Sequence, residues 1–351
     1  MTTRTACSYC GAGCGISVET RTHTATGTPV IAKVSGDKLH PTNFGRLCTK
    51  GATHAEMMAA TDGRLTTALL RPARDADPVA ADVDDALAEA GSRLRAIVDE
   101  HGPDAVALYV SGQMSIEAQY LATKLAKGFL RTMHIESNSR LCMASAGTGF
   151  KQSLGSDGPP GSYTDFDCTN LFFVIGSNMA DCHPILFLRM ADRLKAGAKL
   201  IVIDPRRIDL VRTPHVSAAH HLQLRPGTNV AVINALAHVI ITEGLADTAF
   251  IAERCEDASF QRWADFIRDA SNSPEAVEAV SGVPASELRE AARLYATGGN
   301  SAIYYGLGVP QHSQGSSMLL SMAHPAMATA NLGKDAGGTH PLPGQTHVQG
   351  P

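Results

Sequence analysis

The sequence predicts an α/β protein in which a small β-rich module at the N-terminus is followed by two domains with mainly parallel sheets. The first residues alternate apolar and polar side chains with a period of two and are rich in β-branched residues, as strands are. From about residue 80, short continuous apolar runs alternate with amphipathic helical segments, which is typical of parallel sheets covered on both faces. The 351 residues, 44% of them hydrophobic, are enough to form a large core.

The N-terminal module is expected to span residues 1–57. Its clearest strands are 15–20 and 29–36, where the period-two alternation is strongest. A stretch rich in proline and aspartate, residues 71–78, follows the module and is typical of a connector.

The rest of the chain repeats the order helix then strand. Apolar residues share one helical face over 83–100 and 115–129, and further helices are predicted at 185–196, 229–241, 260–270 and 285–295. Continuous apolar runs predict strands at 105–110, 171–176, 199–204 and 301–306, with a strand-like segment at 219–224. We expect two Rossmann-like α/β domains, one incomplete and formed by residues 58–135 plus 300–351, the other formed by residues 136–299.

Composition and charge argue against two classes of partner. The formal net charge is −4 and the pI is near 6.4, so no basic surface for nucleic acid is indicated. No run of about 18 apolar residues is present, so no membrane span is predicted. The residues Met1–Ala6 do not resemble a secretory leader, and we expect a cytoplasmic protein.

Four cysteines near the N-terminus have the spacing of a metal cage. Cys7, Cys10 and Cys14 lie within eight residues, and Cys48 follows after a gap of 33. Glycines between and after the first three allow a tight loop, and this spacing favours a 4Fe-4S cubane, whose four corners each need a thiolate. Structural zinc is the main alternative, although zinc sites usually pair two CxxC-like knuckles. Disulfides are disfavoured in the expected compartment.

Glycine or an acid follows several predicted strands directly. Such segments are 112–113, 176–178, 204–206 and 306–308, and residues 225–229 follow the strand-like segment. In open α/β sheets, ligands bind beyond the carboxyl ends of strands, where amides and helix N-termini receive phosphates. The pattern therefore indicates a nucleotide-bearing ligand. Each segment taken singly is weak evidence, since glycine at a strand end is usually only a turn.

Two further residues have a functional and an ordinary interpretation. Cys142 lies where a loop enters a predicted helix, a position that lowers a thiol pKa and favours a metal ligand or nucleophile, but the residues alone favour a buried structural cysteine. Lys50 follows Cys48 by two residues, so its ammonium can screen a cluster and a second anionic cofactor, or be a plain surface lysine. Cys168, Cys182 and Cys255 have no partner spacing and are expected to be core thiols.

Taken in order, these motifs resemble the molybdopterin oxidoreductase family, and within it the cytoplasmic assimilatory nitrate reductases. The resemblance rests on the cysteine cage with Cys-Thr-Lys-Gly and on five later segments, which are 138–146, 176–184, 204–207, 225–229 and 311–315. It covers nearly the whole chain.

The resemblance implies two cofactors, a 4Fe-4S cluster on Cys7, Cys10, Cys14 and Cys48, and molybdenum bis(molybdopterin guanine dinucleotide) with Cys142 as the protein ligand to the metal. Lys50 is then expected to relay electrons between cluster and pterin. The residues implied to bind the pterin dinucleotides are Lys50, Gln113, Asn138, Gly176, Ser177, Asn178, Asp181, Asp204, Arg206, Gly227, Thr228, Asn229, Leu307 and Gln311.

The activity implied by the resemblance is reduction of nitrate to nitrite by oxygen-atom transfer, with electrons from a single-electron donor (ferredoxin, flavodoxin or a reductase subunit) entering through the cluster. Formate dehydrogenases of the same superfamily usually place histidine after the metal-ligating residue, whereas Met143 follows Cys142 here. Formate oxidation is one alternative, and an inactive iron-sulfur electron-transfer fragment is another.

The length of the chain departs from the family pattern. Family members are roughly twice as long, and Pro343 stands where they usually have arginine. We therefore expect the N-terminal portion of a catalytic subunit, truncated within a domain.

Overall fold

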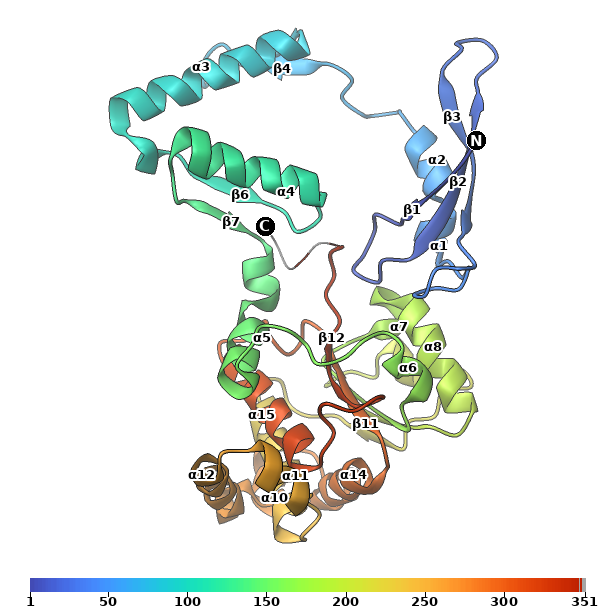
Figure 1. Cartoon of the computed structure of the whole chain (residues 1–351), viewed down its shortest axis with the longest axis vertical. Helices are drawn as coiled ribbons and strands as arrows, with labels where there is room; N and C mark the ends of the chain where they lie inside the picture. Colours follow the sequence, from blue (N-terminus) through green and yellow to red (C-terminus); the bar gives the residue numbers. More distant parts are fainter. Residues whose placement is uncertain (347, 349–351) are drawn as a thin grey trace.

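The computed structural model describes residues 1–346 and 348. The N-terminal module is an antiparallel three-stranded sheet followed by two short helices, and Figure 1 shows it in blue at one corner of the molecule. Both predicted strands are present here, joined by a third. The elements are β1 (Thr2–Ala6), β2 (Gly15–Thr22), β3 (Pro29–Gly36), α1 (Thr49–Ala52) and α2 (His54–Ala59).

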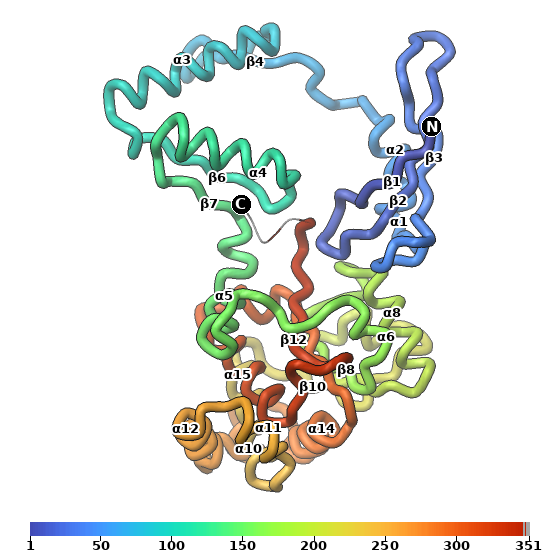
Figure 2. The backbone as a smooth tube through the Cα atoms, in the orientation of Figure 1, coloured from blue at the N-terminus to red at the C-terminus, as the bar shows by residue number. Residues whose placement is uncertain are grey.

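The next region forms an extended arm that reaches across the top of the molecule in Figures 1 and 2. It holds an antiparallel ribbon and a two-stranded parallel sheet, each flanked by helix. The predicted helix at 115–129 changes from α to π geometry at residue 124. The elements are β4 (Ala68–Leu70), β5 (Val79–Ala81), α3 (Val83–His101), η1 (Pro103–Ala105), β6 (Leu108–Val110), α4 (Ile116–Thr123), η2 (Lys124–Leu130) and β7 (Ile135–Ser137).

A five-stranded sheet, parallel throughout, is the centre of the lower body, with strand order β10-β9-β8-β11-β12. The strands are β8 (Leu171–Ile175), β9 (Lys199–Ile203), β10 (His220–Leu222), β11 (Ser301–Tyr305) and β12 (Gly338–Pro341). Side chains alternate between the two faces of β8, since Phe173 joins one core cluster and Phe172 the other. Both faces are covered, as the continuous apolar runs predicted.

Helices pack on the two faces of this sheet. One core cluster contains residues from α8, and the other contains residues from α5, α10, α13, α14 and α15. The helices of this body are α5 (Ser139–Leu154), α6 (Asp165–Cys168), α7 (Met179–Cys182), α8 (Pro184–Lys195), α9 (Asp209–Arg212), α10 (Asn229–Thr242), α11 (Thr248–Arg254), α12 (Asp257–Arg268), η3 (Ala270–Asn272), α13 (Pro274–Ser281), α14 (Ala285–Thr297) and α15 (Gly315–Ala328).

The strand pairing differs from the predicted grouping of residues 300–351 with 58–135. β11 lies between β8 and β12, with Ser301 opposite Leu171 and Tyr305 opposite Ile175. Residues 301–341 therefore complete the sheet of the 136–299 region. The physical reason is that a buried parallel strand needs a neighbour on each side, and an apolar run does not specify which strand that neighbour is.

One buried arginine ties the N-terminal module to the lower body. Arg189 on α8 forms an ion pair of 2.6 Å with Asp167 and donates to the carbonyls of Pro41 and Thr42 at 2.9 and 3.0 Å. Its guanidinium also lies 5.2 Å from the ring centroid of Phe44. These contacts hold residues 41–44 of the N-terminal module against α8.

Among the residues that the structure describes, no helix combines the length and the apolar character needed to cross a lipid bilayer.

Candidate metal and cofactor site

The four N-terminal cysteines converge on one pocket. Cys7, Cys10 and Cys14 come from the loop between β1 and β2, and Cys48 comes from the residue before α1. Cys7 and Cys14 are buried, while Cys10 and Cys48 are half-buried. The loop is closed by a hydrogen bond of 2.7 Å from the backbone N–H of Cys7 to the carbonyl of Cys14. The rest of the pocket is formed by Tyr9, Ala12, Leu47, Gly51, Pro184 and Ile185.

The electrostatics of this pocket show how close the four sulfurs are. Burial, together with the charges of Cys10, Cys7 and Cys48, raises the pKa of Cys14 to about 12. Burial also raises the pKa of Cys7, and a hydrogen bond from the backbone N–H of Tyr9 lowers it in part. Four mutually repelling thiolates in a buried pocket need a cation among them, so the donor set fits a metal centre.

Cys142 lies on the first turn of α5, as the sequence indicated, and is only 8% exposed. The prediction that the helix N-terminus lowers its pKa is not what the structure shows. Burial raises the pKa of the Cys142 thiol, and the backbone N–H of Gly344 lowers it in part. The next residue, Met143, packs against the main core cluster.

A short segment, residues 342–345, touches the cysteine loop, α5 and α8, and we call it the connecting segment. Its Gly344 carbonyl accepts from the backbone N–H of Gly11 at 3.1 Å, in addition to the Gly344 contact with Cys142. His183 donates from Nε2 to the carbonyl of Pro343 at 2.8 Å. The approach at Gly11 is so close that an added Cβ would lie 2.7 Å from the Pro343 oxygen. The cysteine loop and Cys142 are therefore held by one piece of backbone.

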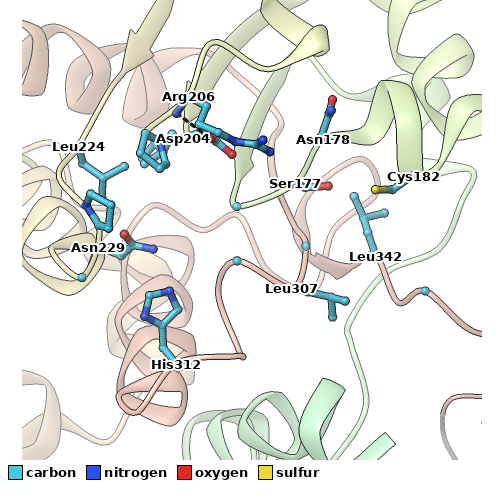
Figure 3. Close-up of a pocket in the computed structure, with 18 of the residues that line it drawn as sticks. Ser177, Asn178, Cys182, Asp204, Arg206, Leu224, Asn229, Leu307, His312 and Leu342 are labelled. Atoms are coloured by element: carbon cyan, nitrogen blue, oxygen red, sulfur yellow. Dashed lines mark hydrogen bonds between the residues drawn. The ribbon is translucent and has the colours of Figure 1, made fainter. Parts of the chain in front are cut away.

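A cavity of about 420 Å³ lies at the carboxyl ends of the parallel strands. In Figure 3, Leu224 and Asn229 lie on one side of it, and Cys182 and Leu342 lie on the other. Gly176, at the end of β8, has a φ of 58° and packs so tightly on the end of β11 that an added Cβ would meet Gly308 at 2.8 Å. The lining residues are Gly176, Ser177, Asn178, Cys182, His183, Ile203, Asp204, Pro205, Arg206, Leu224, Pro226, Gly227, Asn229, Gly306, Leu307, Gly308, His312, Leu342 and Gly344.

Two buried acceptor atoms of this cavity have no protein partner among the described residues, Asn178 Oδ1 and His183 Nδ1. Buried polar atoms in proteins are almost always hydrogen-bonded, so unpaired ones on residues that line a cavity suggest a bound ligand with donors. A hydrogen bond orients the acid at the end of β9. Asp204 Oδ1 accepts from the backbone N–H of Arg206 at 2.9 Å (Figure 3).

Most of the residues expected to bind pterin dinucleotide come together. Those that line the cavity are Gly176, Ser177, Asn178, Asp204, Arg206, Gly227, Asn229 and Leu307. Asp181 lies beside it and accepts from Asn178 Nδ2 at 2.7 Å, and Thr228 precedes α10 and donates to the Arg225 carbonyl at 2.7 Å. Gln311 donates its backbone N–H to the Leu307 carbonyl at 3.2 Å.

The remaining predicted residues lie near the cysteine pocket or near Cys142. Gln113 donates from its side chain to the Ser8 carbonyl in the cysteine loop. Asn138 precedes α5 and accepts from the backbone N–H of Gly112 at 3.0 Å. Lys50 is exposed, and its charge lowers the pKa of both Cys7 and His183. Lys50 is therefore close enough to act electrostatically on a residue of the cysteine pocket and on a residue of the cavity.

The residues of the site that sequence reasoning missed include His183, His312, Leu342 and Gly344. A histidine directly before Pro184 could have been noticed, because it opens a helix at a strand end, but nothing local marks Leu342 or Gly344. The prediction that Cys182 and Cys168 are core thiols was wrong, since both are exposed and Cys182 lines the cavity.

A parallel α/β body with a cavity at its strand ends, joined to a module with four convergent cysteines, defines a protein that can bind a metal centre and a nucleotide-type ligand. The family model described as molybdopterin oxidoreductase matches residues 69–349, and the model for the molybdopterin oxidoreductase Fe4S4 domain matches residues 1–60. The chain therefore belongs to the molybdopterin oxidoreductase family, and the two matches support a molybdopterin and a 4Fe-4S cluster as its cofactors.

Similar curated proteins include formate dehydrogenase H of Escherichia coli, 36% identical over 350 residues, which are 99% of this chain and 47% of that protein. A nitrate reductase of Klebsiella oxytoca is 37% identical over 99% of this chain and 37% of its own length. A nitrate reductase of Synechocystis is 34% identical over 99% of this chain and 48% of its own length. The chain spans about half the length, or less, of these relatives.

The fold is also similar to a solved structure, that of acetylene hydratase from Pelobacter acetylenicus. The TM-score is 0.80 and the identity 22%, over 95% of this chain and 44% of that one. The likeness supports the α/β fold with its β-rich cysteine module.

Proposed function

We propose that this chain is the cluster-binding and pterin-binding part of a molybdenum enzyme that reduces nitrate to nitrite. The observation that carries the proposal is the position of Cys142, which is buried, held by the connecting segment, and followed by Met143 packed into the core. The formate dehydrogenase pattern has histidine at the position of Met143. When bound, the molybdopterin would supply two-electron oxygen-atom transfer, and the cluster would supply electrons one at a time.

The cysteine pocket is the proposed entry for electrons. Cys7, Cys10, Cys14 and Cys48 would bind the cluster, and backbone N–H groups such as that of Tyr9 would stabilise the sulfur charge. Lys50 would hold a positive charge between the cluster and the pterin. A single-electron donor, of the ferredoxin or flavodoxin kind or a reductase subunit, is the proposed partner.

The cavity at the strand ends is the proposed site for one guanine dinucleotide. Asp204 and Arg206 at the end of β9 offer an acid and a cation, and Asn229 begins α10, whose N-terminus suits a phosphate. Gln113 and Asn138, which lie near Cys142 and the cysteine loop instead, would contact the second pterin.

Formate oxidation is the second candidate. It is favoured by the similarity to formate dehydrogenase H, whose 36% identity is close to the 37% found for a nitrate reductase. The identity of the residue after the metal ligand is the feature that separates the two proposals in this chain. A cluster-binding fragment without turnover is a third possibility, which metal content distinguishes.

Metal analysis of anaerobically purified protein tests the proposal first. We expect about four iron atoms per chain with molybdenum present. Iron without molybdenum would support the electron-transfer fragment, and zinc alone would reject every version of the proposal. Nitrate and formate are then assayed separately, with reduced viologen as donor for nitrate and oxidised viologen as acceptor for formate. Formate oxidation without nitrate reduction would overturn the nitrate assignment.

Replacement of the proposed molybdenum ligand gives the sharpest variant. We expect Cys142→Ala to abolish nitrate reduction while leaving the visible absorbance of the cluster unchanged, because Cys142 does not line the cysteine pocket. Cys14→Ala is the matched variant and should remove the cluster. Full turnover by Cys142→Ala would contradict the assigned role.

A further inference from the structure

The turn that enters α8 separates the cysteine pocket from the cavity. Pro184 and Ile185 line the cysteine pocket, whereas Cys182 and His183 line the cavity. His183 is only 4% exposed and begins the helix as its N-terminal flanking residue. One histidine ring therefore stands in the wall between the two proposed cofactors.

The hydrogen bond to Pro343 fixes the tautomer of His183. Nε2 lies 2.8 Å from the Pro343 carbonyl oxygen, and a carbonyl only accepts, so Nε2 carries the proton. Burial and the nearby charge of Lys50 lower the pKa of His183, which keeps the ring neutral at pH 7. Nδ1 is then a lone-pair acceptor.

This acceptor has no partner among the described residues, although it is fully buried. Leaving such an atom unpaired costs its full desolvation penalty, so a bound donor explains it better than packing does. The Asn178 Oδ1 acceptor of the same cavity is also unpaired. Two buried acceptors suit a ligand with ring or exocyclic N–H donors, as in an aminopyrimidine.

The ring of His183 is also linked to Cys142 through the backbone of residues 343 and 344. His183 binds Pro343, and the adjacent Gly344 directs its N–H to the Cys142 sulfur. His183 and Gly344 both line the cavity, so this end of it is the one beside Cys142. The Asp204 end lies at a different strand terminus and is where a nucleotide would bind.

We propose that His183 is a positioning residue for the pterin end of the ligand, accepting a pterin N–H at Nδ1 while its Nε2–H holds the connecting segment against Cys142. This inference rests on the proposed function. A purely structural histidine would use only the Nε2 contact. The two roles can be separated, because an amide side chain can replace one ring nitrogen at a time.

Two amide variants test the inference. Glutamine extends to the position of Nε2, so His183→Gln keeps a donor for Pro343 and removes the Nδ1 acceptor. Asparagine places its oxygen near Nδ1, so His183→Asn keeps the acceptor and removes the Pro343 contact. His238→Gln is the control, since that histidine also binds a backbone carbonyl, at 2.7 Å from Ile267, and does not line the cavity.

The measurement is the rate at which pterin is lost during anaerobic dialysis, from the fluorescence of the oxidised pterin relative to bound iron. We expect His183→Gln to lose pterin about tenfold faster than wild type, as one hydrogen bond of 1.4 kcal/mol predicts. His183→Asn should be at least threefold slower than His183→Gln, and His238→Gln should match wild type. Iron content should be the same in all four proteins.

Three outcomes would overturn the inference, and they are distinguishable. Wild-type rates in both His183 variants would show that the ring does not hold the pterin. A wild-type rate in His183→Gln with rapid loss in His183→Asn would leave only the structural contact with Pro343. Wild-type protein without molybdenum or pterin would reject the proposed function, and the inference with it.

Discussion

The arm formed by residues 58–135 and the body formed by residues 136–346 have the same alternation of helix and parallel strand but very different packing. All five residues of β8 are buried, and eight of the fourteen residues of α10 are buried. All nineteen residues of α3 are described, and none of them is buried. In the arm, Tyr109, Leu121 and Phe129 are 71%, 59% and 68% exposed.

The difference shows what an amphipathic pattern establishes. The pattern identifies the face that a helix would bury, and in the body a five-stranded sheet covers that face. In the arm the same kind of face packs on a sheet of only two described strands, which is too small to cover it. Stability should therefore be concentrated in the body.

The largest expected effect comes from replacing one phenylalanine in each region with alanine. Phe172→Ala removes a fully buried ring that packs at 5.4 Å from Tyr304 and 6.0 Å from Phe166, so the free energy of unfolding should fall by about 3–5 kcal/mol. Phe129→Ala in the arm should change it by less than about 0.5 kcal/mol. Urea unfolding followed by circular dichroism measures both. Equal losses would refute the contrast between the regions.

A second test concerns the arginine that joins the cysteine module to the body. Arg189→Met leaves Asp167 and two carbonyls without their donor, and should lower the free energy of unfolding by about 2–3 kcal/mol, since Asp167 is half exposed. Arg46 forms an exposed pair with Asp192 on the same helix, and Arg46→Met should cost about 0.5 kcal/mol or less. If the two variants were equally stable in urea, the buried contact would not anchor the module.

The smallest effect depends on pH. Burial lowers the pKa of His324 in the body to about 4, whereas His134 in the arm is exposed. The unfolded chain binds a proton near pH 6.5 and the folded chain does not, so stability is complete above pH 6.5 and falls as the pH drops toward 4. At pH 5 the loss should be about 1–2 kcal/mol.

The variant His324→Phe keeps the ring contact with Trp263, which is 5.3 Å between centroids, and removes the titrating group. Its urea midpoint should change less between pH 7 and pH 5 than that of the wild type. His134→Phe should leave the pH dependence unaltered. An unchanged slope in His324→Phe would show that other groups cause the acid sensitivity.

Local sequence patterns predicted the elements of the body well. The run 171–176 became β8, and the helix predicted at 229–241 became α10. The grouping of residues 300–351 differed because the neighbour of a strand is chosen by long-range packing, and Ser301 pairs with Leu171 across 130 positions. The pattern also could not predict how little of the arm is buried, because periodicity does not show which element covers a helical face.

The residues of the site likewise divide into those that the sequence predicted and those that only the structure shows. Glycines and acids at strand ends predicted the edge of the sheet at which a ligand binds, because all parallel strands end there, and the family resemblance supplied eight residues that line the cavity. His183 was missed because its unpaired Nδ1 is visible only in three dimensions. The direction of the Cys142 pKa shift was wrong because burial outweighs the contribution of the helix N-terminus.

The connecting segment makes the cysteine loop and the proposed metal ligand Cys142 depend on a single stretch of backbone. Deleting one residue from it would move Pro343 and Gly344 by about 3.3 Å, the length of one extended residue. The cysteine loop would then lose its partner at Gly11, and the Cys142 sulfur would lose its N–H donor. Under the proposed ligand assignment, such a deletion should therefore lower the iron and the molybdenum content together rather than one at a time.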